Sequence, residues 1–314
     1  MAWQEQVSQI VNDKLSGSLA LTSATATALI DLSEQASFSS IDALLDQLVT
    51  IGEQVLDSQT GMASVVNLYN RVLFAVSPQI TVESGVQVLR ERAQAFLAEQ
   101  YRASTDLSRR CVALMTEGLT ICTYSYSSTV LAALKSAGLS KRKPIVICHE
   151  GRPGLEGRRM AQDLAAANID VTLTVDAAMF SNVRNSEMVI VGADALSEQG
   201  IVSKLGTATL TTCARWLGVP CYVLADTNKI WPFELGTQPL KERDPGEIWD
   251  SPPPGVRVAN RYYDTTSWDA VSGVVTEQGL LTAAEVRQLS RERVAHTTLY
   301  HIIEQMRNRR NEVA

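Results

Sequence analysis

The chain has few cysteines and no spacing typical of a metal-binding cysteine cluster. Its 314 residues include five cysteines, an odd number, and no Cys-x-x-Cys pair occurs. Each lies in an apolar stretch typical of a strand or a helix; they are Cys111, Cys122, Cys148, Cys213 and Cys221. This usage is typical of reduced core residues rather than of zinc ligands. We therefore expect no metal site.

Long apolar runs and an excess of positive charge are also missing. No apolar run approaches the length of a membrane span, and the first ten residues lack the basic-then-apolar pattern of a signal peptide. The formal net charge is -6, so the chain has no basic footprint for nucleic acid or for an anionic membrane. We expect a cytoplasmic protein that binds neither.

The standard nucleotide-binding sequences are absent as well. Neither a GxGxxG fingerprint nor a Walker sequence occurs in the chain. A conventional dinucleotide or nucleoside-triphosphate site therefore has little support, and a generic dehydrogenase is only a distant third interpretation. We expect no cofactor.

What the sequence does contain is two differently patterned parts. Residues 1–118 show apolar residues at helical spacing and little strand signal, which predicts a helical N-terminal domain. Residues 119–314 alternate short β-branched runs with helical segments, which predicts a Rossmann-like α/β domain with a parallel sheet. The predicted strands are 119–124, 144–149, 171–175, 187–191, 221–225 and 271–275.

The most informative stretch is 187–210, which reads EMVIVGADALSEQGIVSKLGTATL. Its apolar run predicts a strand buried on both faces, and Gly192-Ala193-Asp194 ends that strand with one carboxylate. A polar turn follows, and Lys204 is predicted to open a helix that runs to about Gly218. In open α/β sheets, ligands bind beyond the carboxyl ends of the strands. Asp194 and Lys204 are therefore candidates for binding a small anion.

Polar residues follow each of the first five predicted strands. They are Ser125 to Ser128, Glu150 to Pro153, Asp176, Asp194, and Asp226 to Lys229. Ser127 and Asp176 are more simply interpreted as helix caps. Arg152, Lys204 and Lys229 supply three cations at this edge, and Arg offers a planar fork suited to phosphate. The predicted ligand is an anionic small molecule bound at the strand ends.

Several segments, in the same order, resemble one family. The family comprises the alpha, beta and delta subunits of initiation factor 2B together with methylthioribose-1-phosphate isomerase and ribose-1,5-bisphosphate isomerase. The segments are HEGRPGLEGRRMAQDL at 149–164, IVGADALSEQGIVSKLGTATL at 190–210, LADTNKIWP at 224–232 and VVTEQGLLTAAEV at 274–286. The resemblance covers roughly residues 121–286. It implies a helical domain before a Rossmann-like domain, a bound sugar phosphate or nucleotide, and a homodimer.

The resemblance also implies functional positions, and several of them carry a different residue here. The isomerases have a catalytic Cys where this chain has Ser125, and an Asn where it has Ser203. The family's early Arg-Gly-Ala phosphate loop appears as Ser16-Gly17-Ser18, and its Arg-Pro-Thr segment as Gln59-Thr60-Gly61. Asp194, Arg152, Lys204 and Lys229 are retained. A serine hydroxyl needs an adjacent base to move a proton, whereas a thiol ionises more easily.

Two functions therefore remain open. In the first, the chain is an aldose–ketose isomerase acting on a ribose-1-phosphate-type substrate. Asp194 and Ser125 would then move protons, and the binding residues would be Arg152, Ser203, Lys204, Lys229, Gly17 and Gln59. In the second, it is a non-catalytic, regulatory protein that binds a sugar phosphate or a nucleotide, as the resemblance to initiation-factor subunits implies. The retained Asp194 favours the isomerase, and Ser125, which replaces the catalytic cysteine, favours the regulatory protein.

Overall fold

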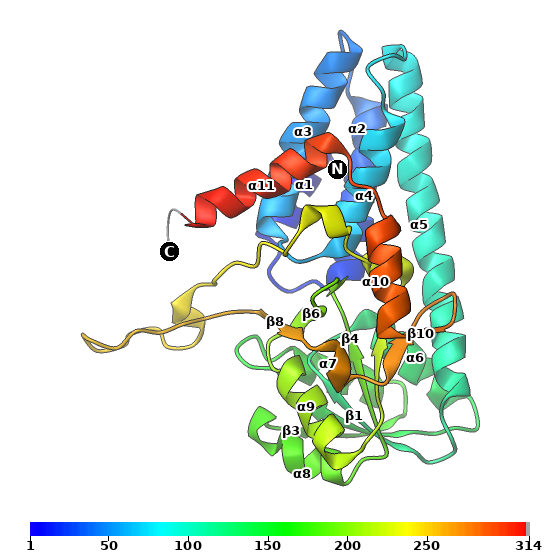
Figure 1. The fold of residues 1–314 in the computed structure, drawn as a ribbon, viewed down its shortest axis with the longest axis vertical. Coiled ribbons are helices and arrows are strands. Elements are labelled where there is room, and N and C mark those ends of the chain that lie inside the picture. Colours follow the sequence, from blue (N-terminus) through cyan, green and yellow to red (C-terminus); the bar gives the residue numbers. More distant parts are fainter. Residues whose placement is uncertain (312–314) are drawn as a thin grey trace. The chain divides into compact units, whose positions relative to one another are not determined.

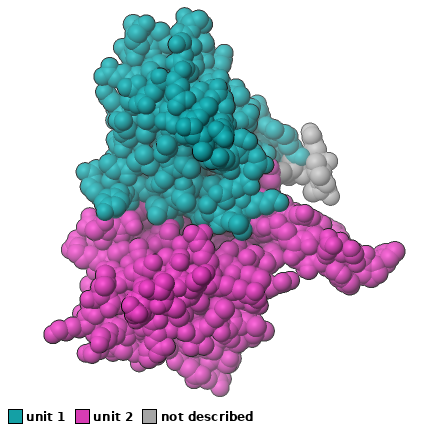
Figure 2. All heavy atoms as spheres, turned by 180° about the vertical axis from the view of Figure 1, so that it is seen from behind, with its two compact units in different colours: residues 1–102, 228–239, 288–314 teal, residues 103–227, 240–287 magenta. Residues whose placement is uncertain are grey.

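A computed structural model describes residues 1–311 of the chain and shows two compact units (Figures 1 and 2). The first unit contains residues 1–102, 228–239 and 288 onward, and the second contains 103–227 and 240–287. The division into domains between residues 118 and 119 stays a prediction. The last three residues of the predicted second domain lie outside the described residues.

The first unit is helical, as the sequence predicts. Its helices are α1 (Trp3–Asn12), α2 (Ser18–Gln35), α3 (Ile41–Ser58), α4 (Ala63–Ala75), the first part of α5 (Val82–Ala113) and α11 (Thr297–Asn311). Ser40 caps α3, because its hydroxyl accepts a hydrogen bond from the Ala43 amide at 3.2 Å. Thr81 does the same for α5 through the Ser84 amide.

Helix α5 is longer than its sequence pattern predicts. We expect the amphipathic helix to end near residue 103, whereas it continues to Ala113. Ala103, Leu107 and Cys111 are all buried and stand four residues apart. They continue one apolar face of the helix, and this face packs into the core of the second unit. The burial of these three residues explains the extension.

The second unit is built on a seven-stranded sheet. Its strands, in spatial order, are β10 (Leu280–Leu281), β9 (Gly273–Val275), β7 (Cys221–Leu224), β4 (Met188–Gly192), β1 (Thr120–Tyr124), β2 (Ile145–His149) and β3 (Asp170–Thr174). All neighbours pair in parallel except β10, which is antiparallel to β9. The ends of all six predicted strands are confirmed to within two residues. The predicted fold class, a Rossmann-like parallel sheet after a helical region, is confirmed as well.

Helices connect these strands and cover the sheet. They are α6 (Ser128–Leu139), α7 (Glu156–Ala165), α8 (Met179–Arg184), α9 (Thr207–Leu217) and α10 (Ala283–Glu292). Helix α6 packs on α7, and α8 packs on α9. The segment LTAAEVRQLSRERV predicts a helix beginning near Thr282, and α10 confirms it; a separate helix, α11, begins at Thr297.

A second, small sheet forms where the sequence predicts only a turn and the start of a helix. Strands β5 (Ala195–Leu196), β6 (Ile201–Lys204) and β8 (Tyr263–Thr266) pair antiparallel in that order. Lys204 is therefore the last residue of a strand, and α9 begins only at Thr207. The prediction that Lys204 opens a helix is wrong, because pairing with β8, distant in sequence, holds residues 201–204 extended.

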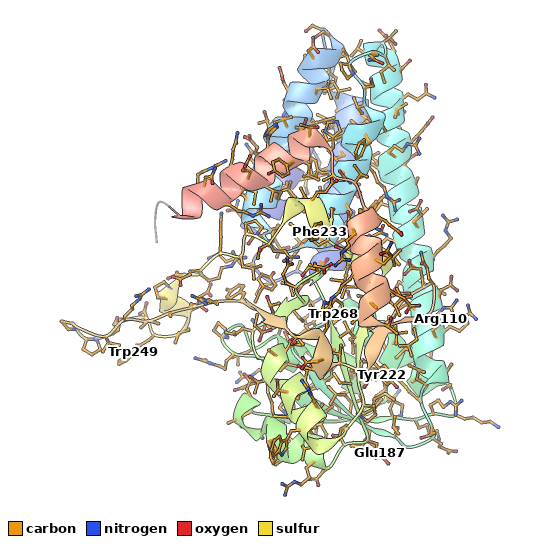
Figure 3. All side chains as sticks on the ribbon, in the orientation of Figure 1. Arg110, Glu187, Tyr222, Phe233, Trp249 and Trp268 are labelled. Carbon is orange, nitrogen blue, oxygen red and sulfur yellow. The ribbon has the colours of Figure 1, made fainter. Side chains whose placement is uncertain are left out.

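The polar segment before β8 has little regular structure. It contains the short 3-10 turn at Pro245–Glu247, and Trp249 lies on it with half of its side chain exposed (Figure 3). Asn260 binds the Asp244 carbonyl and Glu247, and Tyr262 donates to Glu247 at 2.5 Å. These bonds join the two ends of the segment. Among residues 1–311, no helix combines the length and the apolar character needed to cross a membrane.

One glycine tests how tightly the second unit is packed at the ends of its strands. A Cβ at residue 157 would stand 1.8 Å from the His149 carbonyl oxygen at the end of β2. We predict that Gly157→Ala lowers the free energy of unfolding by about 2–3 kcal/mol, since this backbone cannot move aside without disturbing the sheet. Urea unfolding measures the change. The matched control is Gly246→Ala, where the nearest atom belongs to an exposed Asp side chain at 3.2 Å. Equal stability of both variants would contradict the packing described.

Candidate functional site

The chain reverses its direction across the sheet between β1 and β4. The path β1, β2, β3 runs toward one edge, whereas β4, β7, β9 runs toward the other. Two neighbouring parallel strands whose chains leave in opposite directions form a topological switch point, and a crevice opens outside their carboxyl ends. Ser125 directly follows β1, and Asp194 follows β4 by two residues. The sheet therefore brings these two predicted site residues to the same switch point.

The loop after β1 is held closely against its neighbours. Ser125 is buried and has a φ of 59°, a left-handed conformation that is uncommon for serine. Ser127 caps α6 by accepting a hydrogen bond from the Val130 amide, as the sequence predicts. A Cβ at residue 192 would stand 2.4 Å from the Ser127 hydroxyl, so only glycine allows the ends of β1 and β4 to approach this closely.

The loop after β2 is ordered by a carboxylate from the next strand. Asp176, which follows β3, accepts hydrogen bonds from the backbone amides of Gly151 at 2.9 Å and Arg152 at 2.7 Å. The helix-cap interpretation of Asp176 is wrong, since its side chain binds this loop and not the turn that it begins. The Arg152–Pro153 peptide bond is cis. Arg152 thus has a fixed backbone, while its exposed guanidinium forms no ion pair among residues 1–311.

Lys204 is not a free cation. Its ammonium lies 2.6 Å from Oε1 of Glu156, and both side chains are mostly buried. The ammonium also lies 4.7 Å from the centroid of the Tyr262 ring, a favourable position for a cation. Glu156 is the first residue of α7 and is absent from the sequence-based site. A carboxylate in the first turn of a helix, soon after the Gly-Arg-Pro loop, is the sequence signal that could have identified Glu156 as a site residue.

Ser203 lies on β6, and Asp194 directly precedes β5, the strand that pairs with it. The buried Ser203 hydroxyl donates to the Gly192 carbonyl at 2.9 Å, so it joins β6 to the end of β4. The amide of half-buried Asp194 donates to the Val202 carbonyl at 2.8 Å. The pKa of Tyr263 is raised, first by burial and then by the negative charge of Asp194. The carboxylate of Asp194 therefore lies near this tyrosine of β8.

Three predicted binding residues belong to the first unit. Gly17 directly precedes α2. The buried Gln59 amide donates to the carbonyls of Ile10 at 2.7 Å and Asp13 at 2.9 Å. Lys229 is also buried and ends the 3-10 turn Thr227–Lys229. Both amide hydrogens of Gln59 are thus bonded to carbonyls of the first unit. An arginine at that position would carry a positive charge, whereas glutamine carries none.

The last residue of β2, directly before the loop that carries Arg152, is a buried histidine. His149 Nδ1 lies 3.1 Å from the Thr123 carbonyl, and the Asn182 amide nitrogen lies 3.2 Å from Nε2. A carbonyl can only accept and an amide nitrogen can only donate, so these contacts fit a neutral ring that carries its proton on Nδ1. Burial lowers the pKa of His149 below its usual value of 6.5, against smaller opposite effects of Thr123 and Asp176. The ring is a structural element beneath the loop.

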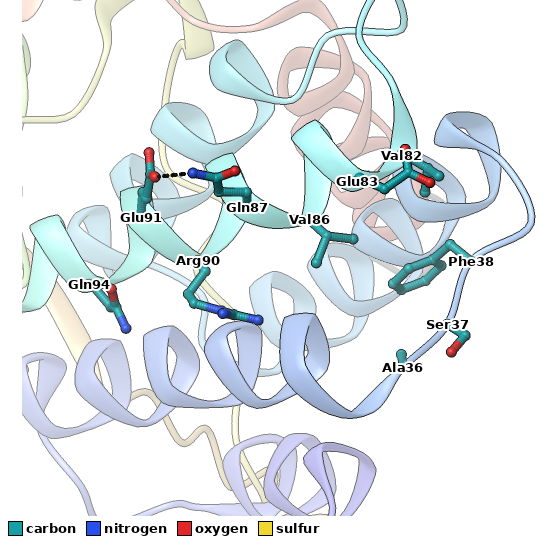
Figure 4. Close-up of a pocket in the computed structure, with 10 residues that line it drawn as sticks. All are labelled: Ala36, Ser37, Phe38, Val82, Glu83, Val86, Gln87, Arg90, Glu91 and Gln94. Atoms are coloured by element: carbon teal, nitrogen blue, oxygen red, sulfur yellow. Dashed lines mark hydrogen bonds between the residues drawn. The ribbon is translucent and has the colours of Figure 1, made fainter.

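The first unit contains an open groove of about 740 Å³ between the loop after α2 and the start of α5 (Figure 4). Its acidic residues Glu83 and Glu91 outnumber its one cation, Arg90, which is bound to Ser33 and paired with Glu34. None of the predicted site residues lines it. The groove therefore has no surplus positive charge for an anion. Among residues 1–311, no group of three or more His, Cys, Asp or Glu side chains is arranged to hold a metal ion.

Comparison with known proteins decides the family. The model of the Initiation factor 2 subunit family matches residues 14–283, most of the chain. The chain belongs to this family. A translation initiation factor eIF-2B subunit 2-like protein of Pyrococcus horikoshii is 31% identical over 279 residues, which cover 88% of this chain and 95% of that protein. A ribose 1,5-bisphosphate isomerase of Methanocaldococcus jannaschii is 26% identical over 283 residues, 88% and 91% of the two chains.

Solved structures of family members have the same fold. The translation initiation factor eIF-2B of P. horikoshii OT3 aligns with a TM-score of 0.77 at 29% identity, covering 89% of this chain and 96% of that one. The 5-methylthioribose 1-phosphate isomerase of the same organism aligns with a TM-score of 0.71 at 20% identity, which shows the fold alone. The resemblance found in the sequence is confirmed, and the relatives include both factors and isomerases.

The Asp176 carboxylate gives a direct test of the loop. We predict that Asp176→Ala lowers the free energy of unfolding by about 1–3 kcal/mol, because two backbone amides lose their acceptor. Hydrogen exchange of the Gly151 and Arg152 amides should accelerate by about tenfold or more. Asp163→Ala is the control, since within residues 1–311 the Asp163 carboxylate bonds to the side chains of Tyr126 and Arg159 and to no backbone amide. Unchanged exchange at Gly151 in Asp176→Ala would rule out this role.

His149 makes stability depend on pH. Because its folded pKa lies below 6.5, the unfolded chain binds more protons as pH falls through that value, and stability decreases toward the folded pKa. We predict a smaller loss of stability between about pH 7.5 and 5.5 in His149→Gln than in the unchanged protein. Urea unfolding at both pH values measures the difference. The same loss in both proteins would show that His149 is not kept neutral by burial.

Proposed function

We propose that the chain binds a phosphorylated sugar at the switch point of its sheet and isomerises it as an aldose 1-phosphate. One observation carries the proposal: Ser125 and Asp194 follow the two strands that flank the switch point, and the loop after the neighbouring β2 carries Arg152, whose guanidinium forms no ion pair among residues 1–311. Neighbouring strands are about 4.8 Å apart, so residues that follow them can reach one small ligand. The isomerases among the relatives, ribose 1,5-bisphosphate isomerases at 26–28% identity, support this reading.

Arg152 is proposed to bind the phosphate. Its guanidinium can form two parallel hydrogen bonds to an oxyanion, and Asp176 fixes the backbone from which it extends. Lys204 contributes less charge, because Glu156 already neutralises it. Ser203, Lys204, Lys229, Gly17 and Gln59 stay predicted binding residues, and a homodimer stays the expected assembly.

Asp194 and Ser125 are proposed to move the protons. Isomerising a ring-closed aldose 1-phosphate requires ring opening and then proton transfer between adjacent carbons. A carboxylate and a hydroxyl on opposite sides of one crevice can serve as the acid and base of such a transfer, provided that the hydroxyl has an acceptor nearby. The left-handed backbone of Ser125 is consistent with a residue held for function.

A non-catalytic, ligand-binding protein is the second candidate. Gln59 favours it, because its amide is committed to two backbone carbonyls and adds no charge for a second phosphate. The relatives whose names describe them as initiation factors also favour the non-catalytic candidate. A protein of this kind would bind the sugar phosphate or a nucleotide without turning it over.

Turnover separates the two candidates. We predict that the purified protein converts ribose 1,5-bisphosphate or ribose 1-phosphate to the ketose, and that Asp194→Asn lowers kcat/KM by about 10²–10⁴. Formation of the ketose phosphate is followed by NMR. Asp163→Asn should keep full activity, because Asp163 lies on helix α7 and its carboxylate accepts a hydrogen bond from the Tyr126 hydroxyl, not from any residue proposed to bind or convert the sugar. Binding of either substrate without conversion would favour the regulatory candidate, and conversion that survives Asp194→Asn would contradict the assigned role.

A further inference from the structure

The groove of the first unit runs along one side of helix α5. Seven residues of α5 line it, and they recur at the three- and four-residue spacing of a helix face; they are Val82, Glu83, Val86, Gln87, Arg90, Glu91 and Gln94. At 1.5 Å per residue this face extends for about 18 Å, or roughly three turns. The loop between α2 and α3 lines the other side with Ala36, Ser37 and Phe38 (Figure 4). The groove is thus long enough to hold several turns of another helix.

The middle of the groove is apolar. Val86 of α5 and Phe38 of the loop face each other across it, and Val82 and Ala36 line the same space (Figure 4). All four side chains are only half-buried, so they keep apolar surface in contact with water. Covering that surface with apolar side chains of a partner is favourable.

The polar lining of the groove is acidic. Glu83 and Glu91 are exposed, and neither forms an ion pair among residues 1–311. Arg90, the cation of the lining, is already bound to Ser33 and paired with Glu34. The two carboxylates therefore remain available to a positively charged partner.

The sequence that forms this part of the first unit is acidic as well. Residues 1–70 include eight Asp and Glu residues, whereas Lys14 is their one cation. These residues form α1, α2, α3 and the first half of α4. A surface with charge of one sign attracts partners of the opposite sign and raises their rate of encounter.

We propose that the groove binds a basic amphipathic helix of a partner protein. The backbone groups of α5 bond within their own helix over most of this face, so the partner must satisfy its own backbone, as a helix does. Apolar side chains on one face of the partner would lie between Val86 and Phe38. Glu83 and Glu91 stand about 12 Å apart along α5, so lysines or arginines two turns apart would pair with them. The groove contains none of the residues proposed to bind sugar phosphate, so this role is separate from the proposed function.

A synthetic peptide tests the proposal on the full chain. The probe is a fluorescein-labelled helical peptide of leucine and lysine, about 14 residues long, with its leucines on one face. Fluorescence anisotropy at low salt gives its Kd. The double variant Glu83→Gln, Glu91→Gln should bind roughly 3- to 10-fold more weakly, since each exposed ion pair contributes modestly. The matched control is Asp46→Asn, Glu53→Gln, which removes the same charge from α3 outside the groove and should keep the Kd.

A third variant tests the apolar part of the groove. Val86→Lys places a cation on its half-buried wall and should weaken binding of the peptide by about tenfold or more. Equal weakening by the two double variants would show a response to net charge alone and would overturn the proposal. So would an unchanged Kd in Val86→Lys, or no binding by the unchanged protein. If a variant does not fold, the same peptide with glutamate in place of lysine is tested on the unchanged protein, and equal affinity for both peptides would overturn the proposal.

Discussion

The candidate site depends on one interaction, the pair of hydrogen bonds that the Asp176 carboxylate accepts from the amides of Gly151 and Arg152. The in-register pairing of β2 with β3 places the carboxylate next to these amides. Once the loop is fixed, Gly151 lies under Ser125, and helix α7 begins with Glu156 turned back over the loop. Two features of the candidate site thus follow from a residue outside the set of predicted site residues.

Charge at the site is divided unequally among the predicted cations. Lys204 is paired with Glu156 inside the second unit, and only the guanidinium of Arg152 is exposed there without an ion pair among the described residues. One available cation fits one phosphate group. The uncharged Gln59 is bound to two carbonyls of the first unit and adds no positive charge.

The strands and their polar ends could be predicted from the sequence because the signals are local. A β-branched run such as 188–191 predicts its strand without knowledge of its neighbours, and the switch-point rule then places Ser125 and Asp194 together. Lys204 was misplaced because β6 is held by β8, some sixty residues later in the chain. The partners of Asp176 and Glu156 also lie far away in sequence, and no local pattern shows which amide or ammonium a carboxylate will meet.

In the proposed function, the loop after β2 binds the phosphate of the ligand at the switch point. A crystal structure of the protein with ribose 1-phosphate bound tests this directly. We expect phosphate oxygens within hydrogen-bond distance of the Arg152 guanidinium, with the sugar between Ser125 and Asp194. A phosphate bound away from Arg152, with the Gly151 loop unchanged, would contradict it.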